Sequence, residues 1–269
     1  MKKFISARVV TLLLVILVVG VVLNYHKDLI QRGNISSLLA ENLDSRLAPH
    51  RINRVNRLRA ILAHGIRSLE VDLMFRPSNG GGYFEIGHDE SDASGVGLAE
   101  FLDTLGGAGL KKIWLDIKNI TEGNIDAALA ELIRLDSLYD LRKTAIVESS
   151  FGSESLRRIS NAGFHTSFYL PTVRIKELLA SGDTMALQKE AEAIAAQVWA
   201  QQLAAVSFDL ALYSFVKGHL ESIIPDTTVY HVWDSVKLWE WDAIRELKDR
   251  NYFKDARVAT ILYEYWGPD

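Results

Sequence analysis

The sequence predicts an α/β protein, a (β/α)8 or TIM barrel that is preceded by an N-terminal membrane segment. Three observations carry this prediction. An uncharged apolar run lies near the N-terminus, short β-branched or aromatic runs then alternate with longer helical patterns, and polar residues gather on one face of the expected strands. At 269 residues the chain has the length of one large domain with an appendage.

The first element is the uncharged stretch 9–25, VVTLLLVILVVGVVLNY, which follows a basic start, residues 1–8. Its length and composition fit a transmembrane anchor or a signal segment. No small-x-small cleavage pattern follows Val22, which favours an uncleaved anchor. A cleaved signal and a buried or interfacial helix are the alternatives.

The positive charges predict the orientation of this segment. Basic residues flanking a span stay in the cytoplasm, so 1–8 is expected there. The rest of the chain is then membrane-anchored on the non-cytoplasmic side, periplasmic or extracellular. The polar stretch 26–45 is expected to be a tether with a short helix, and 46–269 the barrel domain.

The alternation of patterns defines the elements of that domain. Eight strands are expected, near 46–50, 67–74, 112–118, 143–150, 164–169, 204–209, 227–233 and 257–263. Helices are expected between them, for instance at 53–64, 97–106, 123–136, 153–162, 184–202 and 236–250. Eight strands in βα order suggest a closed barrel.

The two faces of each strand differ in character. In 67–74, aliphatic residues at 69, 71 and 73 share one face, while Ser68, Glu70 and Asp72 share the other. The strand at 112–118 repeats this, with Asp116 and Lys118 on the polar face. A barrel accommodates both faces, because aliphatic side chains meet the outer helices and polar ones point inward toward the active-site end. The alternative is a mixed sheet with a solvent-exposed polar face.

Composition excludes several classes of protein. A net charge of -4 and a pI near 6.0 provide no global basic field, so a nucleic-acid partner is not expected. The absence of cysteine excludes disulfides, thiolate zinc sites and thiol nucleophiles.

The inward polar residues form the candidate site. They are His50 and Arg51 after the first strand, Glu70 and Asp72 in the second, His88 and Asp89 on the following hairpin, and Asp116 and Lys118 in the third. Carboxylate oxygens suit a hard divalent cation, Mg²⁺ or Ca²⁺. Two histidines can divide the work of general base and acid, and a lysine can stabilise a phosphoryl group. The set predicts phosphodiester cleavage.

These motifs resemble the glycerophosphodiester phosphodiesterase-like members of the PLC-like phosphodiesterase superfamily of TIM barrels. The family's His-Arg, Glu-x-Asp, His-Asp and Glu-x-Lys resemble His50-Arg51, Glu70-Val71-Asp72, His88-Asp89 and Asp116-Ile117-Lys118. Its Ser-Phe segment resembles Ser150-Phe151, and its late-strand tryptophan resembles Trp233 within HVWD. The matches run in order over roughly 48 to 265.

The resemblance implies roles for these residues. His50 and His88 would be the acid-base pair, Glu70, Asp72 and Asp116 the metal ligands, and Lys118 a charge-stabilising contact. We also expect Arg51, Glu148, His231 and Trp233 to contact the substrate.

The chain departs from the family's pattern in three places. The Gly and Pro-Glu-Asn-Thr run that usually follows His-Arg is absent, Asp116 replaces the more common Glu, and Asp234-Ser235 replaces Thr-Val-Asn. These changes put the glycerol specificity in doubt.

The sequence therefore predicts a metal-dependent phosphodiester hydrolase that acts on a glycerophosphodiester or a related lipid headgroup, next to a membrane. Two alternatives stay open. One is a phospholipase D-like activity on lysophospholipids or sphingolipids, and the other is a non-catalytic barrel that binds phosphate esters.

Overall fold

The structure is a computed structural model that describes residues 7–149 and 155–267. In these residues, nine strands form one curled sheet in the order β1-β9-β8-β7-β6-β5-β4-β2-β3. The strands are β1 Leu47–Pro49, β2 Ser68–Ser78, β3 Gly81–Ile86, β4 Lys112–Ile117, β5 Ala145–Ser149, β6 His165–Tyr169, β7 Ala205–Asp209, β8 Val229–Lys237 and β9 Val258–Glu264.

The eight expected strands are all present and pair in parallel, except that β1 and β2 do not form a ladder with each other. β3 is an additional antiparallel partner of β2. The two ends of the parallel array nevertheless lie together, since the amide of Ile52, just after β1, donates to the carbonyl of Glu70 at 2.9 Å. The sheet is thus compatible with the predicted barrel.

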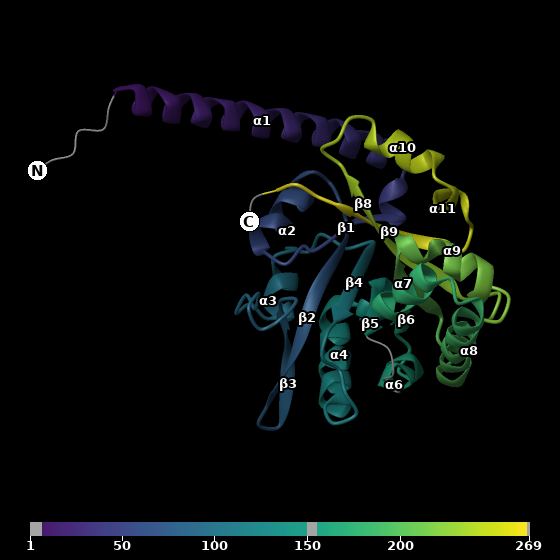
Figure 1. The fold of residues 1–269 in the computed structure, drawn as a ribbon. Coiled ribbons are helices and arrows are strands. Elements are labelled where there is room, and N and C mark those ends of the chain that lie inside the picture. The colour runs from purple at the N-terminus through teal and green to yellow at the C-terminus, as the bar shows by residue number, and fades with distance from the viewer. Residues whose placement is uncertain (1–6, 150–154, 268–269) are drawn as a thin grey trace, which may run out of the picture.

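Helices cover the outside of the sheet (Figure 1). They are α2 Val55–Ala63, α3 Leu98–Asp103, α4 Ile125–Tyr139, α5 Leu141–Thr144, α6 Ser155–Asn161, α7 Thr172–Ser181, α8 Thr184–Gln201, α9 Tyr213–Phe215, α10 Ala243–Asp249 and α11 Asn251–Lys254. The helix expected at 236–250 begins only at Ala243, because β8 continues past a bulge to pair Lys237 with Glu264. α7 has no counterpart among the expected elements.

Both faces of β2 are buried, which excludes the alternative of a solvent-exposed polar face. Leu69, Val71 and Leu73 are fully buried in the main hydrophobic core, and Glu70 and Asp72 on the other face are 1% exposed. The aliphatic face packs outward and the polar face points into the curled sheet. This arrangement sets acidic side chains inside the protein.

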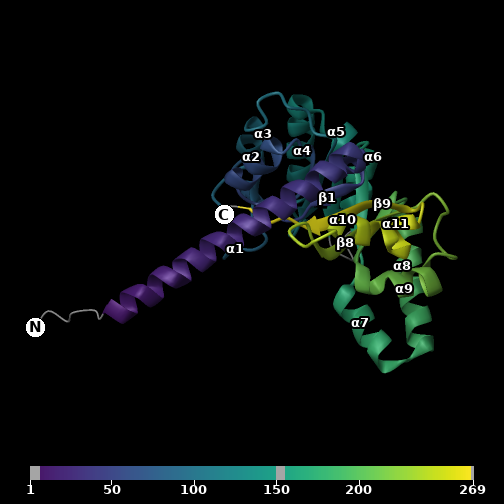
Figure 2. The same cartoon turned by 90° about the horizontal axis from the view of Figure 1, so that it is seen from above.

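The N-terminal helix α1 is a continuous helix over Ala7–Ala40. Among the described residues it is the one helix long and apolar enough to cross a membrane. Apart from Gly20, every residue from Leu12 to Leu23 is at least 50% exposed, and this half extends away from the domain in both views (Figures 1 and 2). Length and composition are thus compatible with an anchor or a signal segment.

The stretch 26–45, expected as a tether with a short helix, differs from that expectation. The helix continues through it to Ala40, and Ile35 and Leu38 are buried in the core of the domain. Asn34 Nδ2 donates to the carbonyl of Leu238 at 2.8 Å, and Gln31 exchanges two hydrogen bonds with the backbone of Trp266. Apolar side chains at 35 and 38 recur at helical spacing, so this part of α1 docks as an outer helix.

Deleting residues 1–25 should leave a folded, soluble domain. The deleted side chains described in the structure contact solvent, while the docking residues from Gln31 onward are retained. Size-exclusion chromatography and circular dichroism of the truncated chain provide the test. An insoluble or unfolded product would show that the apolar segment belongs to the core.

In the same truncated chain, Leu38→Ala should lower the free energy of unfolding by about 2 to 5 kcal/mol, because it leaves a cavity where α1 docks. Leu29→Ala is the matched control: Leu29 lies on the same helix but is 56% exposed, so its loss should cost less than about 0.5 kcal/mol. Denaturant unfolding measures both. Equal effects would mean that the docking of α1 does not stabilise the domain.

Candidate active site

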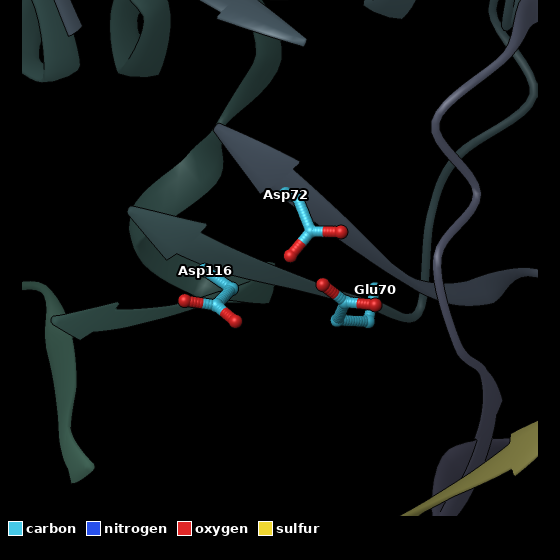
Figure 3. Close-up of side chains that lie close together, drawn as sticks. All are labelled: Glu70, Asp72 and Asp116. Carbon is cyan, nitrogen blue, oxygen red and sulfur yellow. The ribbon is translucent and has the colours of Figure 1, made fainter. Parts of the chain in front are cut away.

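Three carboxylates meet at the inner face of β2 and β4 (Figure 3). Glu70 and Asp72 are two residues apart on β2, so they share a face. The parallel register places Asp116 of β4 opposite Asp72. One oxygen from each of the three carboxylates lies within 4.8 Å of the other two.

Glu70 is held by the backbone that follows β1. Its Oε2 accepts a hydrogen bond from the amide of Arg51 at 2.6 Å. Arg51 has a φ of 55°, a left-handed conformation that is uncommon for a residue other than glycine. The second oxygen, Oε1, is buried and has no hydrogen-bond partner among the described residues.

Asp72 is held by Asn53, a residue at the start of the helix expected at 53–64 that was not predicted to belong to the site. Asn53 Nδ2 donates to Asp72 Oδ2 at 2.7 Å, and Asn53 Oδ1 accepts from the Asp72 amide at 3.0 Å. The two bonds fix both the strand and the carboxylate. Asn53 is itself buried, so the clamp is shielded from water.

Lys118 provides the positive charge nearest to the cluster. Its Nζ lies 2.7 Å from Asp72 Oδ1 and also contacts Asp116 Oδ2. Burial alone would lower the pKa of Lys118, but Asp116 and Asp72 outweigh it and raise that pKa above its ordinary value. Lys118 therefore stays charged.

The carboxylates differ in how easily they ionise. Burial, followed by repulsion from Asp72 and Asp116, raises the pKa of Glu70 well above its ordinary value. Burial also raises the pKa of Asp116, although Lys118 opposes this. Burial would raise the pKa of Asp72 too, but Lys118 and Asn53 hold it below its ordinary value.

This donor set fits a hard divalent cation. Three carboxylates lie next to one lysine. Arg51 adds little positive charge, because its side chain is 55% exposed and its Nε is 3.8 Å from Asp72 Oδ2. The cluster thus carries excess negative charge when it is ionised, and it offers an unpaired buried oxygen, Glu70 Oε1. Mg²⁺ and Ca²⁺ take oxygen ligands of this kind, and the residues do not distinguish between the two ions.

His50 lies between two carboxylates. Its Nδ1 is 3.4 Å from Glu264 Oε1, and its Nε2 is 3.7 Å from Glu70 Oε2. Glu264 ends β9 and was not among the sequence-predicted residues, although strand alternation places it on the inner face with Leu262. The hydrogen bond from His50, followed by its charge, lowers the pKa of Glu264.

His88 lies on the loop that follows β3. Its Nδ1 is 3.5 Å from Asp89 Oδ2, and its side chain is 43% exposed. The two predicted histidines therefore differ in exposure, since the His50 side chain is 19% exposed and His88 lies at the edge of the site at 43%.

A pocket of about 340 Å³ opens over the cluster. It brings together seven of the sequence-predicted residues, namely His50, Arg51, His88, Asp116, Lys118, Glu148 and Trp233. Glu70 and Asp72 lie behind them, adjoining Asp116. Four further residues that were not predicted to belong to the site also line the pocket, namely Trp114, Ile117, Tyr169 and Leu262.

One wall of the pocket is aromatic and acidic. Tyr169 and Trp233 stack with ring centroids 5.2 Å apart, and both line the pocket. Glu148 is 2% exposed and its Oε2 has no hydrogen-bond partner among the described residues. Burial, followed by the charge of Asp116, raises the pKa of Glu148 well above its ordinary value.

His231, expected to contact substrate, is not among the residues that line this pocket. It is 2% exposed, its Nε2 is 3.0 Å from His165 Nε2, and its ring lies against that of Trp114. Since β8 points His231 and Trp233 to the same face two residues apart, only the outer of the two reaches the pocket. Ser150 and Phe151, which resemble the family's Ser-Phe segment, lie outside the described residues.

The curled sheet of this α/β fold has counterparts among solved structures. The chain is similar to a glycerophosphodiester phosphodiesterase from Parabacteroides distasonis ATCC 8503, with a TM-score of 0.51 and 11% identity over 82% of this chain and 92% of that one. It is also similar to a protein from Silicibacter pomeroyi DSS-3 assigned as a glycerophosphoryl diester phosphodiesterase, with a TM-score of 0.51 and 16% identity over 82% and 90%. No family model and no curated protein matches the chain. The resemblance noted in the sequence is confirmed for the fold.

Glu70→Gln should weaken binding of Mg²⁺ or Ca²⁺ by about tenfold or more, because it keeps the shape of the side chain but removes a ligand charge. Isothermal titration of the purified chain measures the affinity. Glu100→Gln, an exposed position on α3, is the control and should leave it unchanged. Unchanged affinity in both Glu70→Gln and Asp72→Asn would exclude a metal site here.

The raised pKa of Glu70 predicts a pH effect in chelator. A carboxyl whose folded pKa is raised contributes stability below its ordinary pKa of 4.5, and that stability is lost as pH rises through the folded pKa. Glu70→Gln should therefore gain melting temperature relative to wild type as pH rises from about 4 to about 8. Thermal unfolding across this range tests the sign, and a pH-independent difference would contradict it.

Proposed function

We propose that this protein is a metal-dependent phosphodiester hydrolase that acts on a glycerophosphodiester or a related lipid headgroup. The observation that carries the proposal is the cluster of Glu70, Asp72 and Asp116 beneath a pocket that two histidines line. The similarity of the fold to solved phosphodiesterases supports the same class.

Glu70, Asp72 and Asp116 would hold Mg²⁺ or Ca²⁺. The bound ion would supply Lewis-acid polarisation of a phosphoryl oxygen. Lys118 keeps a fixed positive charge at the pocket, where it would stabilise the phosphoryl oxygens. Glu70, through Arg51, also fixes the backbone beside His50.

His50 and His88 would act as the general base and the general acid of the reaction. Glu264 orients the ring of His50 through Nδ1, which leaves Nε2 on the side of the carboxylate cluster. His88 faces the pocket from the loop after β3, where it meets solvent. A base of this kind takes a proton from the attacking oxygen, and an acid gives one to the leaving alcohol.

The aromatic and acidic wall of the pocket would receive the alcohol part of the substrate. Tyr169 and Trp233 offer apolar ring surface there, and Glu148 offers an unpaired acceptor. Arg51, at the rim, would contact the phosphate or a charged headgroup.

The apolar half of α1 would anchor the enzyme in a membrane, with the domain on the non-cytoplasmic side. The exposure of its side chains and its length support this part of the proposal. An anchor of this kind keeps the pocket close to phospholipid.

The test is a screen of the purified chain against glycerophosphodiesters, lysophospholipids and sphingolipids, with Mg²⁺, Ca²⁺ or chelator. Release of an alcohol that depends on the ion is the expected result. Release of the free headgroup from a lysolipid or sphingolipid would favour phospholipase D-like activity. Binding of a diester without turnover would identify a non-catalytic barrel.

His50→Ala and His88→Ala should each lower turnover by about 10² to 10⁴ and leave metal affinity nearly unchanged. The wild-type rate should follow a bell-shaped pH profile, since one imidazole must be neutral and the other protonated, and each variant should lose one limb. His219→Ala, away from the pocket, is the control. Wild-type turnover in either variant would make the histidines structural.

A further inference from the structure

The residues that line the pocket are divided by charge. Those that follow β1, β3 and β4 carry positive charge when protonated, and they are His50, Arg51, His88 and Lys118. Those on β5, β6 and β8 offer one carboxylate and two aromatic rings, and they are Glu148, Tyr169 and Trp233. The strands β5 to β8 are contiguous in the sheet, so the carboxylate and the rings belong to one wall.

Glu148, when it is ionised, carries a charge that no described side chain pairs with. The residue is 2% exposed, and its Oε2 has no hydrogen-bond partner among the described residues. Lys118 Nζ forms its ion pairs with Asp72 and Asp116 instead. With Glu70, that cluster has three negative charges and one positive charge, and one divalent cation would balance it. Glu148 then remains as a buried group that a cation from outside the chain would stabilise in its ionised form.

The surroundings of Glu148 fit an organic cation better than a second metal ion. Glu148 is not in the group of carboxylates whose oxygens lie within 4.8 Å of one another, and Mg²⁺ or Ca²⁺ requires several oxygen ligands. Its neighbours toward the pocket are aromatic. The register places Ser167 of β6 opposite Glu148, and Tyr169 follows on the same face, stacked on Trp233. The faces of such rings attract ammonium groups.

Glu148 also lies a short distance from the place proposed for the phosphate. Glu148 is opposite Asp116 in the register of β5 and β4, and neighbouring strands are about 4.8 Å apart. Asp116 contacts Lys118, which would stabilise the phosphoryl oxygens. A cation at Glu148 and a phosphate at Lys118 are therefore separated by a spacing on the order of one strand, which suits the two-carbon chain of an amino alcohol.

We propose that Glu148 selects substrates whose alcohol carries a positive charge, so that the preferred diester is a zwitterionic ester of phosphate and an amino alcohol. A primary ammonium group would donate to the carboxylate of Glu148, and a quaternary one would contact the rings of Tyr169 and Trp233. Arg51 then contacts the phosphate and not the headgroup. The inference rests on the proposed function, and it adds the charge of the headgroup and the residue that recognises it.

The test measures binding, because binding does not require turnover. The probes are two phosphate monoesters with a cationic alcohol, phosphoethanolamine and phosphocholine, each compared with a neutral isostere. Propyl phosphate replaces the ammonium group of the first by methyl, and dimethylbutyl phosphate replaces the quaternary nitrogen of the second by carbon. Isothermal titration of the purified full chain with Mg²⁺ gives the affinity ratio for each pair.

The wild-type chain should bind each cationic ester about tenfold or more tightly than its isostere, as one charge-assisted contact implies. Glu148→Gln keeps the shape of the side chain and should lower both ratios to about one. Glu246→Gln, an exposed carboxylate on α10, is the control and should leave both ratios unchanged. Trp233→Leu should lower the ratio for phosphocholine more than that for phosphoethanolamine, because a quaternary ammonium has no N–H to donate to Glu148.

Equal affinity of the wild-type chain for the esters and their isosteres would overturn the inference without any variant. Unchanged ratios in Glu148→Gln, together with a loss of Mg²⁺ affinity as large as that in Glu70→Gln, would make Glu148 a metal ligand instead. Hydrolysis of diesters is scored separately. Charge-selective binding without turnover refutes the hydrolase and keeps the inference, whereas turnover with equal binding refutes the inference alone.

Discussion

The mutual repulsion of three carboxylates inside a curled sheet is the constraint on which the rest of the site depends. Glu70 and Asp72 are brought together by the two-residue repeat of one strand, and Asp116 joins them through the register of the next. Lys118 compensates part of the charge, while Glu70 Oε1 remains buried without a partner. Burying charge is costly unless it is compensated, so the surrounding structure has to hold these groups in place against their repulsion.

The supporting contacts cluster where the two ends of the parallel array meet. Arg51 and Asn53, which follow β1, bond to Glu70 and Asp72 on β2, and His50 bridges toward Glu264 on β9. The polar contacts that orient the site also hold the end of β1 against β2, since these two strands share no ladder, whereas β1 pairs directly with β9. A substitution that weakens one of these contacts is therefore expected to change both the stability of the junction and the geometry of the pocket.

Much of this arrangement is readable from the sequence because strand alternation is a local property. The inner positions of Glu70, Asp72, Asp116 and Lys118 follow from a period of two, and all eight expected strands are present. Asn53 and Glu264 could not be found in this way, since their roles arise from contacts between segments 19 and 214 residues apart.

His231 shares a strand face with Trp233, but alternation does not predict how deep in the sheet a residue lies. The continuity of α1 was missed because its polar residues, such as Asn34, suggested a tether, whereas they bond to the domain.

Because α1 is one uninterrupted helix that is docked on the domain, its length sets both the distance and the rotation between its apolar half and the domain. An α-helix turns about 100° per residue, so one residue inserted between the apolar half of α1 and Gln31 would swing the domain by more than a quarter turn about the helix axis. A flexible linker would absorb such a change without effect. With α1 in the anchoring role proposed for it, the inserted residue would carry one flank of the domain away from the bilayer and bring another toward it. The number of residues from Tyr25 to Gln31 thus fixes the rotation of the domain about the axis of α1. Substitutions in this segment should be tolerated far better than insertions or deletions.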